Sequence, residues 1–292
     1  MHCMTVPNMR TGYLDICRRV VEQGSRVAPR GIVTHELTDV IIEVKNPRDC
    51  LPVGVGRKLN SAIAAAEALQ LIGGVSTPQL LSDITPNFDQ FKDGDRFWAA
   101  YGDRVRFTPE PEAMLSGPLA SLHQASAVVR KLTADPDSRQ AVMTLWQPAK
   151  DNEQGKHDYP CTTSLIFTIR SGLLSLHTTM RSNDVFWGLA YDAFQFTQLQ
   201  LTVAGALGVQ AGPYFHHAIS LHAYERDFEA IGKMYYPKTA SPLTESPDGV
   251  RGSNPELHGT WRDREEAAQY MLSGVGITSQ HPFWGESLGQ YV

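Results

Sequence analysis

The sequence predicts an α+β, or mixed α/β, fold in a single domain over residues 1–292. Several stretches place apolar residues at the spacing of one helix face, whereas others are rich in β-branched and aromatic residues and are typical of strands. The clearest strands form a pair: an apolar run opens at Cys161, turns at Ser171-Gly172 and returns to Met180. A Gly-containing turn between two such runs predicts a β-hairpin. Helices mixed with strands in one chain favour this fold class.

The first hundred residues predict two helices and a strand behind a loose arm at 1–11. Apolar positions from Leu14 to Val21 indicate a helix that ends at a glycine, and a strand is expected at 32–44, before an Asn-Pro pair. A second helix is expected from Leu59 to a glycine pair. The irregular region that follows predicts a small lobe at about 75–110.

The second half predicts further helices and strands around the hairpin. We expect helices at 122–132 and 193–207, the second largely buried, and strands at 139–146 and 214–224. A Pro-, Ser- and Gly-rich segment at about 238–262 predicts a long surface loop.

Composition excludes several classes of protein. The net charge of −5 gives no electrostatic case for nucleic acid as the main partner. The four cysteines are scattered without a CxxC pair, which argues against a zinc site or a disulfide framework. The sequence has no apolar run long enough to cross a membrane and no signal-like N-terminus. We therefore expect a soluble cytoplasmic protein without metal.

Cys161 is the first candidate for chemistry. The hairpin brings this thiol, at the start of one strand, close to Arg181, at the end of its partner. A neighbouring cation lowers the pKa of a thiol and so favours the nucleophilic thiolate. The alternative is that Cys161 is a small buried hydrophobic residue.

Short motifs resemble the thymidylate synthase family in order and spacing: Asp135–Trp146, Pro160–Cys161, Arg181–Asp192 and His222–Tyr224. Cys161-Thr162, Met180–Val185 and Ser220–His222 look most like its cytidylate hydroxymethylase branch. The resemblance runs from about Tyr13 to Phe228 and is weakest in the lobe.

The resemblance implies a thymidylate synthase-like fold, with a mixed β-sheet packed by helices and a homodimer formed through the sheet. It also implies a reaction on a small pyrimidine nucleotide. The cysteine thiolate adds to C6 of the base, and C5 then attacks the one-carbon unit of the co-substrate 5,10-methylenetetrahydrofolate.

Site residues follow from the same resemblance. The implied catalytic residues are Cys161, Glu67, Tyr101 and Asp192. Phosphate binding is implied for Arg30, Arg139, Arg181 and Ser182, and sugar binding for His222 and Tyr224. Base binding is implied for Asp192 and Gly188. Folate binding is implied for Glu67, Asp184, Trp187, Gly188 and Tyr191.

Some of these assignments have plainer alternatives. Glu67, on an alanine-rich helix, is a candidate for a raised pKa, or else it faces solvent. His222 and Tyr224 share a strand face, which suits two hydrogen bonds to one sugar, or else both are core residues. In relatives the arginine matching Arg139 reaches the partner subunit's site. Its neighbour is an arginine there but Gln140 here, and Arg57 and Lys58 are candidates to replace the lost charge.

Asp192 bears on the choice of base. Thymidylate synthases have an asparagine here, whose amide matches O4 and N3–H of uracil. Cytosine presents an amino donor at N4 and an acceptor at N3, so a carboxylate that accepts from N4 and shares a proton with N3 favours cytosine. An unrelated acidic residue in the first turn of a helix is the alternative.

The prediction is therefore a hydroxymethyltransferase that converts CMP or dCMP to the 5-hydroxymethyl derivative. Both reactions of this family pass through an exocyclic methylene group on C5. Hydride transfer from the folate to this group gives a methyl group, whereas addition of water gives a hydroxymethyl group. Alternatives are a thymidylate synthase that methylates dUMP and a non-catalytic relative that binds nucleotide or RNA. Phage relatives act on dCMP, whereas those in nucleoside antibiotic biosynthesis act on CMP, and both substrates stay open.

Overall fold

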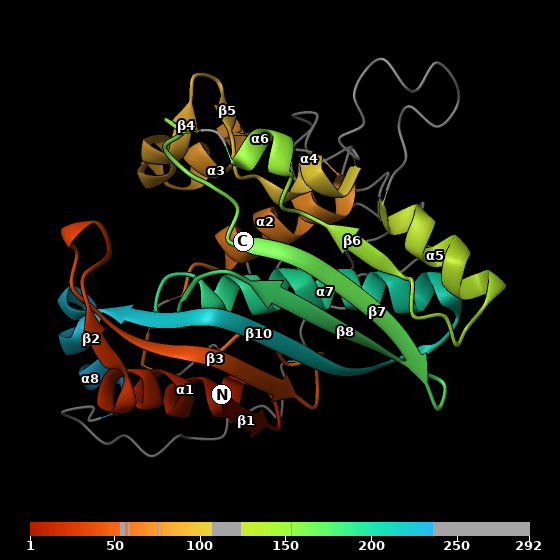
Figure 1. Cartoon of the computed structure of the whole chain (residues 1–292), viewed down its shortest axis with the longest axis horizontal. Helices are drawn as coiled ribbons and strands as arrows, with labels where there is room; N and C mark the ends of the chain where they lie inside the picture. Colours follow the sequence, from red (N-terminus) through yellow and green to blue (C-terminus); the bar gives the residue numbers. More distant parts are fainter. Residues whose placement is uncertain are drawn as a thin grey trace, which may run out of the picture.

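The computed structural model describes residues 1–52, 56–57, 59–74, 76, 78–106, 124–152 and 154–235. Its main feature is an eight-stranded mixed sheet in the order β1-β3-β10-β8-β7-β6, with β2 paired to β3 and β9 paired to β10 (Figure 1). The strands are β1 (His2–Val6), β2 (Ser25–Val27), β3 (Thr34–Val44), β6 (Val142–Thr144), β7 (Thr162–Arg170), β8 (Leu173–Met180), β9 (Asn183–Asp184) and β10 (Gln210–Tyr224).

The helices precede, follow and connect these strands. They are α1 (Met9–Gln23), α2 (Ser61–Gly73), α3 (Pro78–Ile84), α4 (Tyr101–Arg106), α5 (Gln124–Ala134), α6 (Pro148–Asp151), α7 (Leu189–Leu207) and α8 (Phe228–Tyr235). Short 3-10 turns lie at Pro29–Gly31, Pro86–Phe91 and Glu225–Asp227. The lobe predicted at 75–110 contains α3, α4 and a small hairpin of β4 (Lys92–Asp93) and β5 (Arg96–Phe97).

The N-terminus differs from its prediction. Residues 1–11 were expected to form a loose arm, but β1 pairs in parallel with β3, from His2 opposite Val40 to Val6 opposite Val44. Met4 and Val6 are buried in the core, so the strand is held by apolar packing as well as by backbone hydrogen bonds. α1 then begins after Asn8, whose side chain accepts from the amide of Thr11 at 2.9 Å and caps the helix.

The predicted hairpin is confirmed and it orients the site. β7 and β8 pair in antiparallel register around Ser171 and Gly172, whose φ values are 51° and 74°. Left-handed conformations at both central residues suit the twist of a two-residue hairpin. At the open end the amide of Arg181 donates to the carbonyl of Cys161 at 2.8 Å, so the two residues lie opposite each other.

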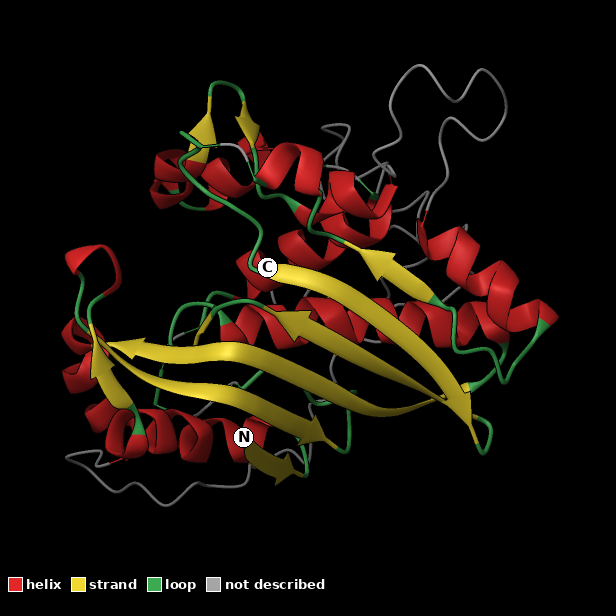
Figure 2. Ribbon diagram, viewed as in Figure 1, coloured by secondary structure: helices red, strands yellow, loops and turns green. Residues whose placement is uncertain are grey.

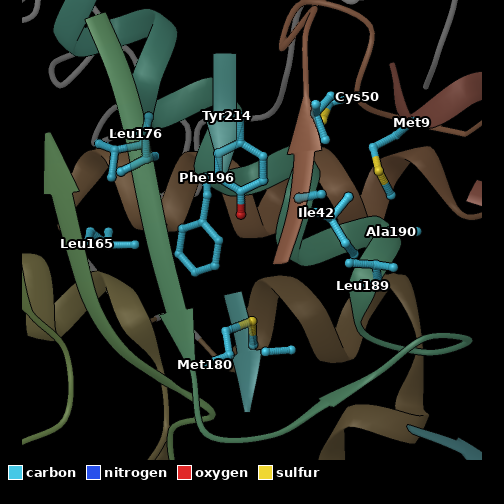
Figure 3. Packing of buried hydrophobic residues seen from close by; sticks show 14 of the residues in the cluster. Met9, Ile42, Cys50, Leu165, Leu176, Met180, Leu189, Ala190, Phe196 and Tyr214 are labelled. Carbon is cyan, nitrogen blue, oxygen red and sulfur yellow. The ribbon is translucent and has the colours of Figure 1, made fainter. Parts of the chain in front are cut away.

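The helices and the sheet share one apolar core. α1, α5 and α7 pack on the same side of the sheet, against β3, β7, β8 and β10. Figure 3 shows part of this core, where Met180, Phe196 and Tyr214 gather between α7 and the strands. α7 is buried over most of its surface, as the sequence predicts.

The opposite side of the sheet faces the viewer in Figure 2. It carries Val142, Leu173 and Ile219, each more than a third exposed. Within the described ranges this face is not covered by a helix. Residues 236–292, with the predicted loop at about 238–262, lie outside the described residues, so the single-domain assignment stays a prediction.

Candidate active site

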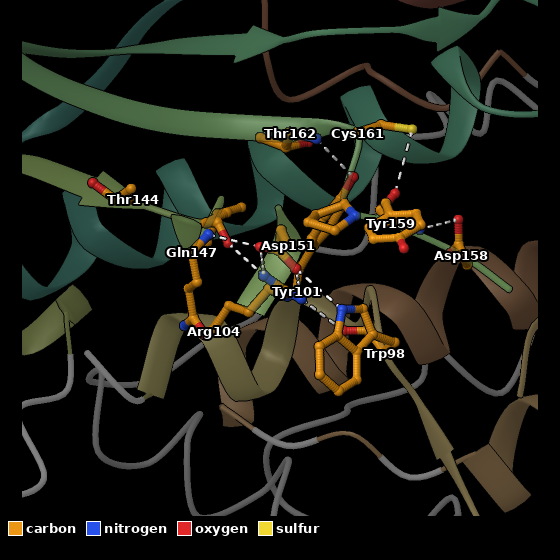
Figure 4. Close-up of polar contacts among 12 residues, drawn as sticks. Trp98, Tyr101, Arg104, Thr144, Gln147, Asp151, Asp158, Tyr159, Cys161 and Thr162 are labelled. Carbon is orange, nitrogen blue, oxygen red and sulfur yellow. Dashed lines mark hydrogen bonds and ion pairs between the residues drawn. The ribbon is translucent and has the colours of Figure 1, made fainter. Parts of the chain in front are cut away.

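Cys161 and Arg181 stand at the open end of the β7–β8 hairpin. The guanidinium of Arg181 is held by two backbone carbonyls, with Nε donating to Pro160 at 3.0 Å and Nη2 donating to Tyr159 at 3.2 Å. Nη2 also lies 3.8 Å from Sγ of Cys161. Figure 4 shows this thiol beside Tyr159 and Thr162. The cation is thus fixed next to the sulfur, as the sequence predicts.

The acidity of this thiol differs from the prediction. Burial raises the pKa of Cys161 to about 12, and the nearby Asp158 and Asp192 act in the same direction. Arg181 and, more weakly, Arg30 lower the pKa, but burial outweighs both. The free protein therefore carries a neutral thiol at this position, and the sulfur can act as a nucleophile only after it loses a proton.

Asp192 lies in the first turn of α7 with both carboxyl oxygens accepting hydrogen bonds. Asn183 Nδ2 donates to Oδ2 at 2.7 Å and Gln195 Nε2 donates to Oδ1 at 3.1 Å. Burial raises the pKa of Asp192 to about 7, against the effect of these two donors. A carboxyl group with this pKa exchanges a proton readily near neutral pH.

Glu67 lies on α2, which packs against α7. Burial raises its pKa to about 8, and the charge of Asp192 adds to the effect. Its Oε2 atom is buried without a hydrogen-bond partner among the described residues. The solvent-facing alternative does not fit a carboxyl oxygen that is buried in this way.

Tyr101 is the first residue of α4 and lies near Cys161. Its hydroxyl accepts from the amide of Thr162 at 3.2 Å, and its ring packs on Phe196 with centroids 5.6 Å apart (Figure 4). Burial raises the pKa of Tyr101 well above its ordinary value, so the hydroxyl keeps its proton. The tyrosine hydroxyl thus contacts the residue that follows Cys161.

Apart from Arg139, the residues predicted for sugar and phosphate lie near the thiol. The rings of His222 and Tyr224 meet edge to face with centroids 5.3 Å apart, which places both on one face of β10. Burial lowers the pKa of His222, so its ring is neutral. Arg30 has a left-handed backbone, and its charge acts on both of these rings and on Cys161. Ser182 follows directly after Arg181.

Arg139 is placed elsewhere. The carbonyl of Ala141, two residues further on, accepts from the amide of Phe167 at 2.9 Å, so Arg139 lies towards the turn end of the hairpin. Six strand residues from Cys161 to Phe167 correspond to about 20 Å. An exposed arginine at that distance cannot reach the thiol of its own chain. Gln140 accepts from Lys131 at 3.0 Å instead of pointing to the site.

The residues predicted for folate lie where β9 leads into α7. Asp184 accepts from the amides of Phe186 and Trp187 at 2.7 and 3.3 Å, and burial raises its pKa to about 6. Trp187 is 56% exposed, and the Tyr191 hydroxyl accepts from the amide of Asn60 at 3.1 Å. These residues offer a carboxyl group beside a flat apolar surface.

Arg57 lies with this aromatic group and not with the phosphate residues. Its guanidinium stands 4.2 Å from the ring centroid of Phe186 and also donates to the Phe186 carbonyl and to the Tyr13 hydroxyl. These contacts occupy the side chain, so the structure gives no support for Arg57 as the replacement for the arginine lost at Gln140. Lys58, the other candidate, lies outside the described residues.

Sequence reasoning missed a buried ion pair next to the site. Arg104 and Asp151 pair through two bonds of 2.6 and 2.8 Å with almost no exposure. Asp151 also accepts from the indole of Trp98 at 3.2 Å, and Arg104 donates to the Trp98 carbonyl at 2.7 Å (Figure 4). The partners come from the lobe and from α6, so no local pattern marks them.

The fold and the site define a class of protein. It is an enzyme domain in which a thiol, an arginine and buried carboxyl groups lie together near the open end of one hairpin of a mixed sheet. The chain belongs to the thymidylate synthase family, because the model of the family described as Thymidylate synthase matches residues 11–244. The family resemblance of the motifs is thereby confirmed.

Individual relatives include hydroxymethyltransferases. A deoxyuridylate hydroxymethyltransferase of Bacillus phage SP01 is 34% identical over 278 residues, covering 91% of this chain and 71% of that protein. One of Pseudomonas phage M6 is 29% identical over 237 residues, 78% of this chain and 62% of that protein. A putative thymidylate synthase of Methanocaldococcus jannaschii is 26% identical over 246 residues, 82% and 97% of the two chains.

The described ranges lack two further features. They contain no group of three or more His, Cys, Asp or Glu side chains that could hold a metal ion. No helix within them is both long and apolar enough to cross a membrane. The cytoplasmic location stays a prediction.

Proposed function

We propose that the protein is a cytidylate 5-hydroxymethyltransferase, which converts CMP or dCMP to the 5-hydroxymethyl nucleotide with 5,10-methylenetetrahydrofolate and water. The observation that carries the proposal is Asp192, a buried carboxyl group whose two oxygens both accept hydrogen bonds beside the reactive thiol. Such a group is complementary to a base edge that presents two donors.

Cytosine meets that requirement when it is protonated at N3. Its N4 amino group then donates to one oxygen of Asp192, and N3–H donates to the other. The pKa of Asp192, about 7, lets the carboxyl group share this proton near neutral pH. Protonation of the ring also stabilises the negative charge that develops when sulfur adds at C6. Uracil instead presents O4, an acceptor, to one of the carboxylate oxygens.

Cys161 is the proposed nucleophile. Its sulfur adds to C6 of the base and makes C5 nucleophilic, while Arg181 stabilises the thiolate and contacts the nucleotide phosphate with Arg30 and Ser182. His222 and Tyr224 are proposed to hold the sugar. Tyr101, whose hydroxyl lies next to the thiol, is proposed to move the proton that leaves C5.

The residues near Asp184 fit the folate. The buried Oε2 of Glu67 is without a partner in the described part of the chain, and the exposed Trp187 ring offers a stacking surface next to Asp184. Enzymes of this family use methylenetetrahydrofolate as a co-substrate, which supplies the carbon that C5 acquires. Loss of the C5 proton and of tetrahydrofolate leaves a methylene group on C5, to which water adds as the new hydroxyl group, and elimination of the Cys161 sulfur from C6 then releases the product. Glu67 is proposed to order this water, with Tyr191 and Gly188 lining the same pocket.

A second candidate is hydroxymethylation of dUMP. It is favoured by the names of the two phage relatives, both described as deoxyuridylate hydroxymethyltransferases. The two candidates share the thiol and the folate and differ only in the base. In its ionised form Asp192 favours cytosine, because a carboxylate opposite uracil O4 leaves an unmatched polar contact that costs ~1–3 kcal/mol.

The decisive experiment is incubation with labelled methylenetetrahydrofolate and, in parallel, CMP, dCMP and dUMP. Label incorporated into a 5-hydroxymethyl cytosine nucleotide supports the proposal, and comparing CMP with dCMP decides the sugar. Hydroxymethyl-dUMP as the main product would establish the second candidate. Methylated dUMP would identify a thymidylate synthase.

We also propose a homodimer formed through the uncovered sheet face, in which Arg139 serves the phosphate site of the partner. Its distance from Cys161 of the same chain supports this arrangement. Mixing Arg139→Ala protein with Cys161→Ala protein tests it, because only mixed dimers would combine an intact thiol with an intact arginine. Recovery of about a quarter of wild-type activity is expected, whereas no recovery would contradict the arrangement.

A further inference from the structure

A chain of buried side chains ends on Asp192. The Tyr214 hydroxyl lies 2.8 Å from Nδ1 of His216, whose Nε2 lies 3.0 Å from Oδ1 of Asn183. Asn183 Nδ2 then donates to Oδ2 of Asp192 at 2.7 Å. Each of the first three side chains is at most 3% exposed. We refer to Tyr214, His216 and Asn183 as the relay; it joins β10 to β9 and β9 to α7.

The three hydrogen bonds of the relay all have their donors and acceptors in one fixed order. Asn183 uses its amide nitrogen on Asp192, so its oxygen faces His216 and needs a donor there. Burial lowers the pKa of His216 to about 3, so the ring is neutral and has a single N–H, which Nε2 must carry. Nδ1 is then an acceptor, and the Tyr214 hydroxyl supplies its proton. Each bond therefore fixes the polarity of the next.

Gly188 gives independent support, because it leaves room for the last bond of the relay. A Cβ atom on Gly188 would lie 3.0 Å from Asn183 Nδ2 and 3.1 Å from Asp192 Oδ2. Its φ of −98° is accessible to any residue, so the glycine is required for space and not for backbone conformation. The fold thus keeps free the place where Asn183 meets Asp192.

We propose that Tyr214, His216 and Asn183 are positioning residues that, with Gln195, hold both oxygens of Asp192 as acceptors and so select a base edge with two donors. The inference rests on the proposed function and deepens it. A carboxylate that already accepts from two amides is complementary to cytosine protonated at N3. The same carboxylate disfavours the binding of uracil, because uracil O4 is an acceptor and would need a donor from Asp192.

Other groups facing Asp192 do not supply this polarity. The charges of Asp184 and Asp158 oppose its ionisation. Glu67, Tyr101 and Cys161, like Tyr214 of the relay, lie close enough for the charge of Asp192 to raise their own pKa values, so none of these acids favours the carboxylate. Within the described residues, the hydrogen bonds that favour the carboxylate come from Asn183 and Gln195.

The test compares Asn183→Leu with wild type in two measurements. Carboxyl ¹³C NMR of the ligand-free protein reports the pKa of Asp192, which should rise by about one to two units when the amide donor is lost. Calorimetry reports the ratio of the Kd values for dUMP and dCMP, and this preference for cytosine should fall at least about tenfold. His216→Gln, which retains an N–H donor, should keep most of the preference, whereas His216→Phe should lose it.

Two further variants guard against a merely structural effect. Thr197→Val removes a buried hydroxyl on α7 that donates to Ala193 and Phe194 backbone oxygens, and it should leave both measurements unchanged. Tyr214→Phe removes one hydroxyl from the far end of the relay, and it should shift both measurements in the direction of Asn183→Leu, by less. It also serves as the test if Asn183→Leu does not fold.

Unchanged pKa and unchanged preference in the relay variants would overturn the inference. The pKa measurement needs no substrate, so its failure refutes the relay whether or not cytidylate is the substrate. Preference of the wild-type enzyme for dUMP, in contrast, would refute the proposed substrate on its own.

Discussion

Asp192→Asn is the substitution that most directly separates cytosine from uracil recognition. The carboxyl group of Asp192 accepts from Asn183 and from Gln195. An amide of the same shape has one oxygen and one NH₂ group, so it can satisfy Asn183 only with its oxygen, because the relay fixes Asn183 as a donor. Its NH₂ group then faces Gln195, whose own amide must turn over.

The size of the effect follows from the groups left opposite the base. The variant no longer shares a proton with cytosine N3, and it gains a donor that can satisfy uracil O4. One unmatched buried polar contact costs ~1–3 kcal/mol. The ratio of kcat/KM for cytidylate to that for dUMP should therefore fall by roughly ten- to a hundredfold.

Steady-state kinetics with CMP, dCMP and dUMP at saturating folate measure this ratio. Asp184→Asn is the matched control, because it also removes a carboxylate from the site, but at a group whose oxygen accepts from backbone amides. It should raise the KM for folate and leave the base ratio unchanged. An unaltered base ratio in Asp192→Asn would refute the role given to this carboxyl group.

Three further predictions concern the other groups of the site. Cys161→Ala should abolish turnover and retain nucleotide binding, as measured by calorimetry; full turnover would refute the mechanism. Arg181→Lys keeps the charge but loses the contacts with Tyr159 and Pro160, so the KM for nucleotide should rise roughly tenfold. Burial raises the pKa of Glu67 from 4.5 to about 8, so between these two pH values the folded state keeps a proton that the unfolded state has lost. The free energy of unfolding of the wild type therefore falls as the pH rises from about 4.5 to about 8. The free energy of unfolding of Glu67→Gln should lack this pH dependence, so its difference from that of the wild type should rise by on the order of 3 kcal/mol between about pH 5 and pH 8. Denaturant titration measures both values, and parallel pH profiles for the two proteins would contradict the prediction.

Local patterns were sufficient for part of the site. The hairpin places Cys161 opposite Arg181 through a turn of two residues, and that register follows from the sequence alone. Glu67 has a raised pKa, as its alanine-rich helix indicates, because such a helix packs on both sides and carries the carboxyl group inside. Both results depend on residues close together in the sequence.

Features that join distant segments were not predictable in this way. The segment of β1 is short, and its sequence alone predicts an irregular arm. It forms a strand because residues 40–44 of β3 pair with it in parallel. His216 and Asn183 are 33 positions apart, and only the parallel pairing of β9 with β10 brings their strands together. The thiol of Cys161 illustrates a different limit, since the extent of its burial, which determines its pKa, depends on the packing of the whole site.

The ion pair of Arg104 and Asp151 has a consequence for how ligands enter. It ties the segment with Trp98 and Tyr101 to α6 through buried charged bonds, and separating such a pair costs ~3–5 kcal/mol. A conformation in which this segment swings away is then populated by roughly one molecule in a few hundred to a few thousand. Nearly all molecules therefore keep this segment against α6, and we expect nucleotide and folate to enter without its displacement.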